Sequence, residues 1–306
     1  QNHSFKIFDK KQSKYIPEDV EQIIGDIRDK NRLEEAMEDV DVVFHMATVP
    51  PSVKLSKKEI HDIDVGGTKN LVDAAFENGV KKVVYTSSAS HVYGIPKSSP
   101  PIKENSGLNP VNEYGKSKVE SEQILKNVSR QNQLNTIVLR LSMVVGPYNS
   151  DPILIENLRN FIHDKKVFVA GEGSSINQSM HIQDVNRALF AAAKNNSSID
   201  SPYEVFNISG KEVLTVNEWM STVKKICSSE SKIVHLPVFL TKAMTSIAWF
   251  LNQSKIHPSY IDLLTHDQYF DISKAEKVLD WKPKHTAEEG LIKTVEFLEN
   301  NKNFYF

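Results

Sequence analysis

The stretch NEYGKSKVESE, residues 112–122, places a tyrosine and a lysine four positions apart, just after an Asn-Pro dipeptide. Apolar residues then recur at helical intervals, at Val119, Ile124, Leu125 and Val128. This pattern predicts a helix over about 112–131. Side chains four apart lie one above the other on a helix, so Tyr114 and Lys118 are predicted to share a face.

The same spacing occurs a second time, at Tyr93 and Lys97. With nine tyrosines in the chain, about one chance match is expected. Pro96 lies inside this second match, and proline removes a backbone donor that a helix needs. Tyr93 and Lys97 are therefore not expected to share a face.

Outside this helix, short β-rich runs alternate with helical patterns. The predicted strands are FKIF (5–8), VEQII (20–24), DVVFHMA (41–47), KVVYTSS (82–88), NTIVLRLSMV (135–144) and YEVFNIS (203–209). The predicted helices lie near 31–38, 57–79, 112–131, 152–163, 184–195, 215–228, 239–252, 273–279 and 286–300. Such alternation predicts an α/β fold with a doubly wound parallel sheet.

The strands thin out after Pro147, which predicts two units of different size. We expect the larger domain to comprise residues 1–148 plus about 181–210. The smaller lobe is expected to comprise residues 149–180 plus 211–306.

The composition of the chain restricts the kinds of protein that it can be. With 306 residues, 40% of them hydrophobic, the chain can bury a substantial core. Its net charge of −2, with the signs interspersed, gives no footprint for nucleic acid or an anionic membrane. The single cysteine, Cys227, excludes an internal disulfide and a cysteine-built metal site, which fits a cytoplasmic location.

The most apolar stretch of the chain is VFLTKAMTSIAWFL, residues 238–251. No apolar run reaches the roughly 18 residues that would span a bilayer, and Lys242 interrupts this one. We expect it to form a buried amphipathic helix.

A series of short motifs follows the same order as in one enzyme family. The motifs are GDIRD (25–29), HMATVPP (45–51), DVGGTKNLVDAA (64–75), YTSSASHVYG (85–94), YGKSK (114–118), LRLSMVVGP (139–147), MHIQDV (180–185), FNISG (206–210) and FDISKAEKVLDWKP (270–283). In this order the chain resembles the extended short-chain dehydrogenase/reductase family over nearly its whole length. That family includes NAD-dependent epimerase/dehydratase and 3β-hydroxysteroid dehydrogenase-like enzymes. The resemblance implies a Rossmann-like NAD-binding domain with a smaller C-terminal substrate lobe.

The resemblance implies that Ser88, Tyr114 and Lys118 form a catalytic triad. Oxidation of a secondary alcohol needs a base on its hydroxyl, and a phenol with a pKa of about 10 is a poor base at neutral pH. Lys118 one turn along can favour the phenolate, and Ser88 at the end of a strand can hydrogen-bond the same substrate oxygen. Tyr114 and Lys118 are also expected to contact the cofactor.

The resemblance further implies that Asp9 binds the adenosine ribose and that Asp26 with Ile27 binds the adenine. Ala47 is expected beside the pyrophosphate. An acid at position 9 repels a 2′-phosphate, so NAD is expected rather than NADP, although Lys10 and Lys11 weaken that preference. Asp64 stands where many relatives carry Asn, which puts one backbone-positioning contact in doubt.

The chain contains no G-x-G-x-x-G fingerprint, and only eight residues precede Asp9. The predicted first strand therefore corresponds to the second strand of a dinucleotide-binding sheet. We expect that about 25–30 residues with the first strand, glycine loop and helix precede Gln1. Without them, the chain is expected to bind NAD weakly or not at all.

Three residue positions bear on the substrate. The Asn and Arg that nucleotide-sugar enzymes usually carry are Met143 and Asn177 here, and no arginine follows Arg187. A diphosphate needs such partners. The C-terminal stretch LPVFLTKAMTSIAWFLNQSKIHPSYIDLL (236–264) instead resembles 3β-hydroxysteroid dehydrogenase-like members, and this resemblance implies a hydrophobic, 3β-hydroxysteroid-like alcohol. A nucleotide-sugar 4-epimerase with retained NAD and a non-catalytic NAD(P)-binding sensor are the alternatives.

Three histidines lie within these motifs. His91 follows Ser88 and is a candidate substrate contact, whereas His45 and His181 are expected to be packed, hydrogen-bonded side chains. No metal is expected. The family resemblance also implies a homodimer through the helices near 57–79 and 112–131.

Overall fold

The computed structural model describes residues 3–131, 134–149, 151–194 and 201–301. The strands are β1 (Lys6–Asp9), β2 (Glu21–Ile24), β3 (Val42–His45), β4 (Lys82–Ser88), β5 (Asn135–Leu141), β6 (Met143–Val145), β7 (Val167–Ala170), β8 (Ser179–His181), β9 (Tyr203–Ile208) and β10 (Ile233–Leu236). The helices are α1 (Lys30–Ala36), α2 (Lys57–His61), the π-helical turn η1 (Asp62–Gly66), α3 (Gly67–Glu77), α4 (Ala89–Tyr93), α5 (Glu113–Arg130), α6 (Pro152–Ile162), α7 (Ile182–Lys194), α8 (Val216–Ile226), α9 (Val238–Phe250), α10 (Ser259–Leu264), α11 (Ser273–Leu279) and α12 (Ala287–Asn300).

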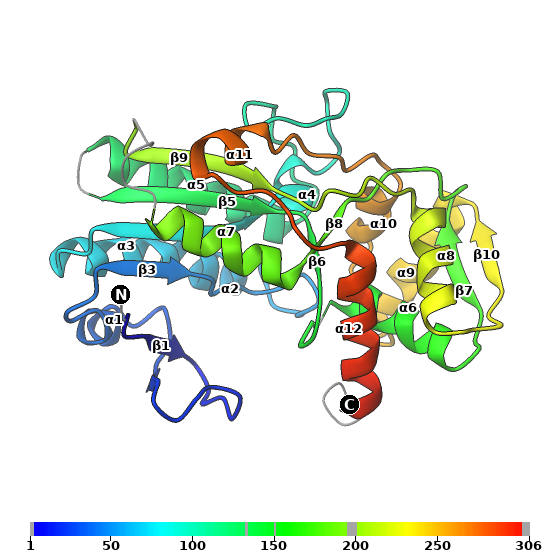
Figure 1. Cartoon of the computed structure of the whole chain (residues 1–306), viewed down its shortest axis with the longest axis horizontal. Coiled ribbons are helices and arrows are strands. Elements are labelled where there is room, and N and C mark those ends of the chain that lie inside the picture. The colour runs from blue at the N-terminus through cyan, green and yellow to red at the C-terminus, as the bar shows by residue number, and fades with distance from the viewer. Residues whose placement is uncertain (1–2, 132–133, 150, 195–200, 302–306) are drawn as a thin grey trace.

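The main sheet is parallel, in the order β3-β4-β5-β9. Successive residues of a strand point to opposite faces, and both faces of this sheet are buried. Val83 and Tyr85 of β4 pack with α3 and α5, whereas Val84 packs with α7 and α11 on the other face. Figure 1 shows these helices on the two sides of the sheet. The predicted doubly wound α/β fold is therefore confirmed.

The first two strands form a parallel pair of their own. Among the residues that the structure describes, no strand lies between β1 and β3 or pairs with either at that edge. This edge is where the expected glycine-bearing strand would lie, and that expectation stays a prediction.

A second hydrophobic core lies at the other end of the molecule (Figure 1). Leu158 and Phe161 of α6, Val223 of α8 and Leu291 of α12 are almost completely buried in it. Two parallel strand pairs, β6-β8 and β7-β10, lie at this end of the molecule. No strand was predicted at β7, β8 or β10, and the first residues of β6 were included in the longer strand predicted over 135–144.

The predicted strand over 135–144 is wrong in its extent. The backbone amide of Ser142 still donates to Ile208 O of β9 at 3.0 Å, but Met143 already pairs with Ser179 of β8. The apolar run therefore continues while its hydrogen-bonding partner changes, and the strand divides into β5 and β6.

The expectation of a buried helix over 238–251 is also wrong. The structure does form α9 there, but none of its residues is buried. Phe239 is 77% exposed and Phe250 is 84% exposed. The side of α9 that faces the protein carries mostly small and polar residues, so its large apolar side chains point outward.

Candidate active site

Ser88 ends β4 at the carboxyl edge of the main sheet, where ligands bind in such folds. The short helix α4, which the sequence did not predict, begins directly after it and places His91 one turn further. The Ser88 Oγ lies 3.0 Å from His91 Nδ1. The other ring nitrogen, His91 Nε2, is buried and has no partner among the described residues. Burial lowers the pKa of His91 to about 3, with Lys118 and His257 adding to the effect, so the ring is neutral.

Tyr114 lies in the first turn of α5. This helix begins one residue later than predicted because the Asn112 side chain caps it and accepts from the Gly115 amide at 2.8 Å. The half-buried Tyr114 ring meets the His91 ring edge-on, with centroids 4.9 Å apart. A side chain at position 115 would collide with the carbonyl oxygen of His91, so the glycine permits this approach.

Lys118 follows one turn along α5 and is almost completely buried. Its Nζ donates to Thr86 O at 2.9 Å and lies 5.5 Å from the centroid of the Tyr114 ring. Burial lowers the pKa of Lys118 to about 8, against the opposing effect of the carboxylates of Asp64 and Glu122. The shared face of Tyr114 and Lys118 is therefore confirmed.

Asp64 is buried beside this pair, in η1. Its Oδ1 accepts from the Val49 amide at 2.8 Å, and its Oδ2 accepts from Ser117 Oγ at 3.0 Å. The backbone contact that the departure from Asn put in doubt is thus present. Burial raises the pKa of Asp64, and both burial and Asp64 raise the pKa of Tyr114.

A buried ion pair lies one turn beyond Lys118. Glu122, one turn after Lys118, accepts from Arg140 Nη2 at 2.6 Å and from Ser87 Oγ at 2.6 Å. Arg140 Nη1 donates to Tyr93 OH at 2.8 Å. The second Tyr-x-x-x-Lys match is therefore structural: Tyr93 is buried in this network, while Lys97 is exposed.

Sequence reasoning missed the far wall of the site, which α10 provides. The Tyr260 ring lies edge-on to the His91 ring at 5.6 Å, and Tyr260 OH donates to Asp151 Oδ2 at 3.1 Å. Ser259 Oγ lies 2.7 Å from His257 Nδ1 and accepts from Asn112 Nδ2 at 2.8 Å. No motif marks these residues, because their contacts with His91, Asn112 and Asp151 join segments more than a hundred positions apart.

The predicted adenosine-binding residues lie near the β1-β2 pair. Asp9 ends β1 with an exposed carboxylate, whose Oδ1 accepts from the Lys11 amide at 3.1 Å. Asp26 is paired with Arg28 at 2.7 Å and with Lys10 at 3.2 Å. The hydrogen bond from Arg28 is the main reason that the pKa of Asp26 lies far below its usual range.

Ile27 and Ala47 differ in their surroundings. The Ile27 side chain is buried in the core against Gly67, so the backbone is what it offers to a ligand. Ala47 is exposed just after β3. The buried Lys118 Nζ beside the Tyr114 ring could hold the ribose at the nicotinamide end of a dinucleotide. For the pyrophosphate the described residues provide no strand with a glycine loop between β1 and β3.

The two remaining substrate candidates make contacts of their own. Met143 is half-buried in β6 and packs against the core formed by α6, α8 and α12. Asn177 Nδ2 donates to Leu264 O at 3.3 Å. Neither contact brings these residues to Ser88 or Tyr114.

His45 and His181 are packed and hydrogen-bonded, as predicted. His45 Nε2 lies 2.8 Å from Thr68 Oγ1, and His181 Nδ1 accepts from the Gln183 amide at 3.0 Å. Among the residues described, no three His, Cys, Asp or Glu side chains are grouped so that they could hold a metal ion. No helix in the same set of residues is long and apolar enough to cross a membrane.

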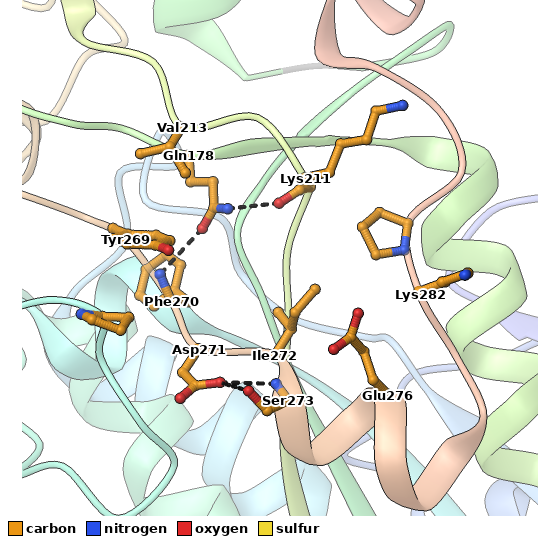
Figure 2. Close-up of a pocket in the computed structure, with 13 residues that line it drawn as sticks. Gln178, Lys211, Val213, Tyr269, Phe270, Asp271, Ile272, Ser273, Glu276 and Lys282 are labelled. Atoms are coloured by element: carbon orange, nitrogen blue, oxygen red, sulfur yellow. Dashed lines mark hydrogen bonds between the residues drawn. The ribbon is translucent and has the colours of Figure 1, made fainter.

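A cavity of about 500 Å³ lies away from this site, beside α11. Figure 2 shows that Gln178 bridges its wall, donating to Gly210 O at 2.6 Å and accepting from the Phe270 amide at 3.1 Å. Lys211 and Lys282 line it as well, but none of the predicted site residues does.

Comparison with known proteins gives one family. The model of the NAD dependent epimerase/dehydratase family matches residues 1–209. N-acetyl-alpha-D-glucosaminyl-diphospho-ditrans,octacis-undecaprenol 4-epimerase from Escherichia coli O157:H7 is 29% identical over 76% of this chain and 68% of its own length. 3Beta-hydroxysteroid-dehydrogenase/decarboxylase isoform 2 from Arabidopsis thaliana is 26% identical over 90% of this chain, which spans only 52% of that protein.

A solved structure shows the same fold. The crystal structure of UDP-glucose 4-epimerase from Thermotoga maritima, with UDP-glucose, superposes with a TM-score of 0.81. It is 22% identical, and the match covers 98% of this chain and 92% of that one.

Proposed function

Because this chain belongs to the NAD-dependent epimerase/dehydratase family, we propose that it transfers hydride between a secondary alcohol and NAD with Ser88, Tyr114 and Lys118. The observation that carries the proposal is the buried Lys118, whose Nζ lies 5.5 Å from the centroid of the Tyr114 ring. Residues 1–148 with about 181–210 would bind the dinucleotide. Residues 149–180 and 211–306 would bind the substrate.

Tyr114 would act as the base on the substrate hydroxyl. Its pKa is raised in the free chain, so its ionisation needs positive charge nearby. Lys118 provides one such charge and would also hold the nicotinamide ribose. When bound, NAD supplies the hydride acceptor and a second positive charge. Ser88 would donate to the substrate oxygen while His91 Nδ1 orients its hydroxyl.

His91 is the proposed substrate contact. With Ser88 against Nδ1, the unpartnered Nε2 is left for a polar group of the substrate. The Tyr260 ring also lies edge-on to the His91 ring, with centroids 5.6 Å apart. The neutral state of His91 suits a hydrogen bond rather than an ion pair.

For the substrate we propose a hydrophobic, 3β-hydroxysteroid-like alcohol. Asn177 is held by Leu264 O, Met143 brings no donor, and no arginine follows Arg187, so a diphosphate would lack its usual partners. The second candidate is a nucleotide-sugar 4-epimerase. It is favoured by the likeness to UDP-glucose 4-epimerase over nearly the whole of both chains.

The two candidate functions differ in whether NADH leaves the site. We expect that a 3β-hydroxysteroid with added NAD releases free NADH, measured by its absorbance. We also expect no tight binding of UDP by calorimetry, because the cationic partners of a diphosphate are missing. Tight UDP binding, together with epimer formation in the absence of added NAD, would decide for the epimerase.

A substitution at Asp9 tests the choice of NAD. Asp9→Ala is expected to weaken NAD and to relax the discrimination against NADP, because the exposed carboxylate repels a 2′-phosphate. The ratio of the two dissociation constants gives the measurement. Asp41→Ala is the matched control, because this exposed acid lies at the other end of the parallel strands. An unchanged ratio in Asp9→Ala would make Asp9 a solvated acid only.

We also propose a homodimer that pairs α3 and α5 with the same helices of a second copy. Within the chain these two helices already lie side by side on one face of the main sheet. A second pair would complete a four-helix interface.

A further inference from the structure

The helix α9 presents its large apolar side chains to solvent. Their exposed fractions are Phe239 77%, Leu240 39%, Met244 49%, Ile247 61%, Phe250 84% and Leu251 54%. On a helical projection these positions fall within one broad arc, so they form a continuous face. An exposed apolar surface of this kind marks an interaction site.

The opposite side of α9 is the one that contacts the protein. It carries Thr241, Thr245, Ser246, Ala248 and Trp249, all half-buried. Lys242, at its edge, is paired with Asp262 of α10 at 2.7 Å. The helix is thus oriented opposite to an ordinary surface helix, which buries its apolar face.

A loop that contacts the end of α9 carries two more exposed apolar side chains. Val53 is 43% exposed and Leu55 is 37% exposed. Lys54, which lies between them in the sequence, links the loop to the end of α9. Its Nζ donates to Trp249 O and, at 2.5 Å, to Asn252 Oδ1. We call Val53, Leu55 and the six exposed apolar residues of α9 the α9 patch.

Lysines outnumber acids around the α9 patch. Residues 238–262 contain two lysines and one acid, Asp262, which pairs with Lys242, and residues 50–59 contain three lysines and one acid, Glu59. Among the described residues, Lys54, Lys58 and Lys255 have no acidic partner, whereas Lys57 is paired with Glu113 at 3.1 Å. The net charge of −2 for the whole chain does not reveal this local excess of lysines.

We propose that the α9 patch inserts into the surface of an anionic lipid bilayer, with α9 parallel to the membrane. An apolar face bordered by lysines is what such an interface accepts. At 13 residues α9 is about 20 Å long, too short for the roughly 30 Å hydrocarbon core, so it lies on the membrane rather than across it. A second copy of the chain fits the α9 patch less well. A two-fold symmetric contact would place the positively charged lysines of the two copies next to one another.

The docked helix would lie close to the active site. The Trp249 ring is 5.1 Å from the His257 ring, and His257 is linked through Ser259 to Asn112, the cap of α5. Membrane binding itself does not depend on the proposed function, and it can be measured without substrate.

The test is sedimentation of the purified protein with two kinds of vesicle. One contains phosphatidylcholine only, and the other contains phosphatidylcholine mixed with phosphatidylglycerol. The protein should sediment with the anionic vesicles, and Phe239→Asp/Phe250→Asp should lose that binding. Lys58→Gln/Lys255→Gln should weaken it by roughly fivefold per lysine. Equal binding of both vesicle types by the parent protein would overturn the anionic requirement.

The matched control is Phe168→Asp/Phe190→Asp. Phe168 is 50% exposed in β7 and Phe190 is 46% exposed in α7, so the number and chemistry of the changes are the same. This variant should bind like the parent, and unchanged thermal melting should show that both variants fold. Equal binding by parent and Phe239→Asp/Phe250→Asp would contradict the proposal. A patch-dependent dimer in light scattering, without vesicle binding, would assign the patch to a second copy instead.

Discussion

Replacement of Tyr114 by phenylalanine is expected to abolish turnover while the free energy of unfolding stays nearly the same. A positioned acid or base contributes typically 10²–10⁴-fold to rate, so a loss of that order is expected. The Tyr114 hydroxyl makes no hydrogen bond to the residues that the structure describes, and its ring packs on His91 without it. Steady-state rates and urea denaturation of the same preparation measure the two effects.

Tyr93→Phe is the matched control, with the opposite expectation. The Tyr93 hydroxyl accepts from Arg140 Nη1 at 2.8 Å and lies 2.8 Å from Asn207 Oδ1, and all three side chains are buried. Its loss leaves buried polar groups unpaired, at about 1–3 kcal/mol each. Turnover per folded molecule should remain. If Tyr114→Phe kept activity within roughly tenfold of the parent, Tyr114 would not be the base.

The second large effect is expected at the buried ion pair. Glu122→Ala should lower the free energy of unfolding by about 3–5 kcal/mol, because it leaves the buried charge of Arg140 without its carboxylate. Burial opposes the charge of Arg140, whereas Glu122 and Tyr93 sustain it and hold its pKa above the usual range. Urea denaturation gives the measurement.

The control for Glu122→Ala is a pair on the surface. Lys293 and Glu296 are 2.8 Å apart in α12, with both side chains more than half exposed. Glu296→Ala should change stability little, because exposed pairs contribute little. A Glu122→Ala loss as small as that of Glu296→Ala would mean that Arg140 finds another partner or water.

Most of the main sheet could be predicted from the sequence. The runs KVVYTSS and YEVFNIS became β4 and β9, because an apolar run between turn signals forms a strand in most contexts. The helix over 112–131 was predicted within one residue at each end. The predicted helix over 57–79 is helical as far as Glu77, but η1 interrupts its α-helical hydrogen bonding at Asp62–Gly66 and brings Asp64 to the site.

Two errors have a common physical cause. Residues 135–144 continue one apolar run although Met143 changes partner, and the broad apolar face of residues 238–251 lies in solvent. An apolar pattern specifies that a segment is compatible with burial. It does not specify which neighbour covers it, or whether one does.

The sequence by itself determined what depends on local spacing: the alternation of strands and helices, Ser88 at a strand end, and the common face of Tyr114 and Lys118. These follow from the periods of the helix and the strand, which are the same in any context. Only the tertiary structure decided that Tyr260 lies against His91, that Glu122 pairs with the buried Arg140, and that α9 turns its apolar face outward. Those arrangements depend on contacts between distant segments, and each contact forms only when the packing of the rest of the chain brings the two side chains together.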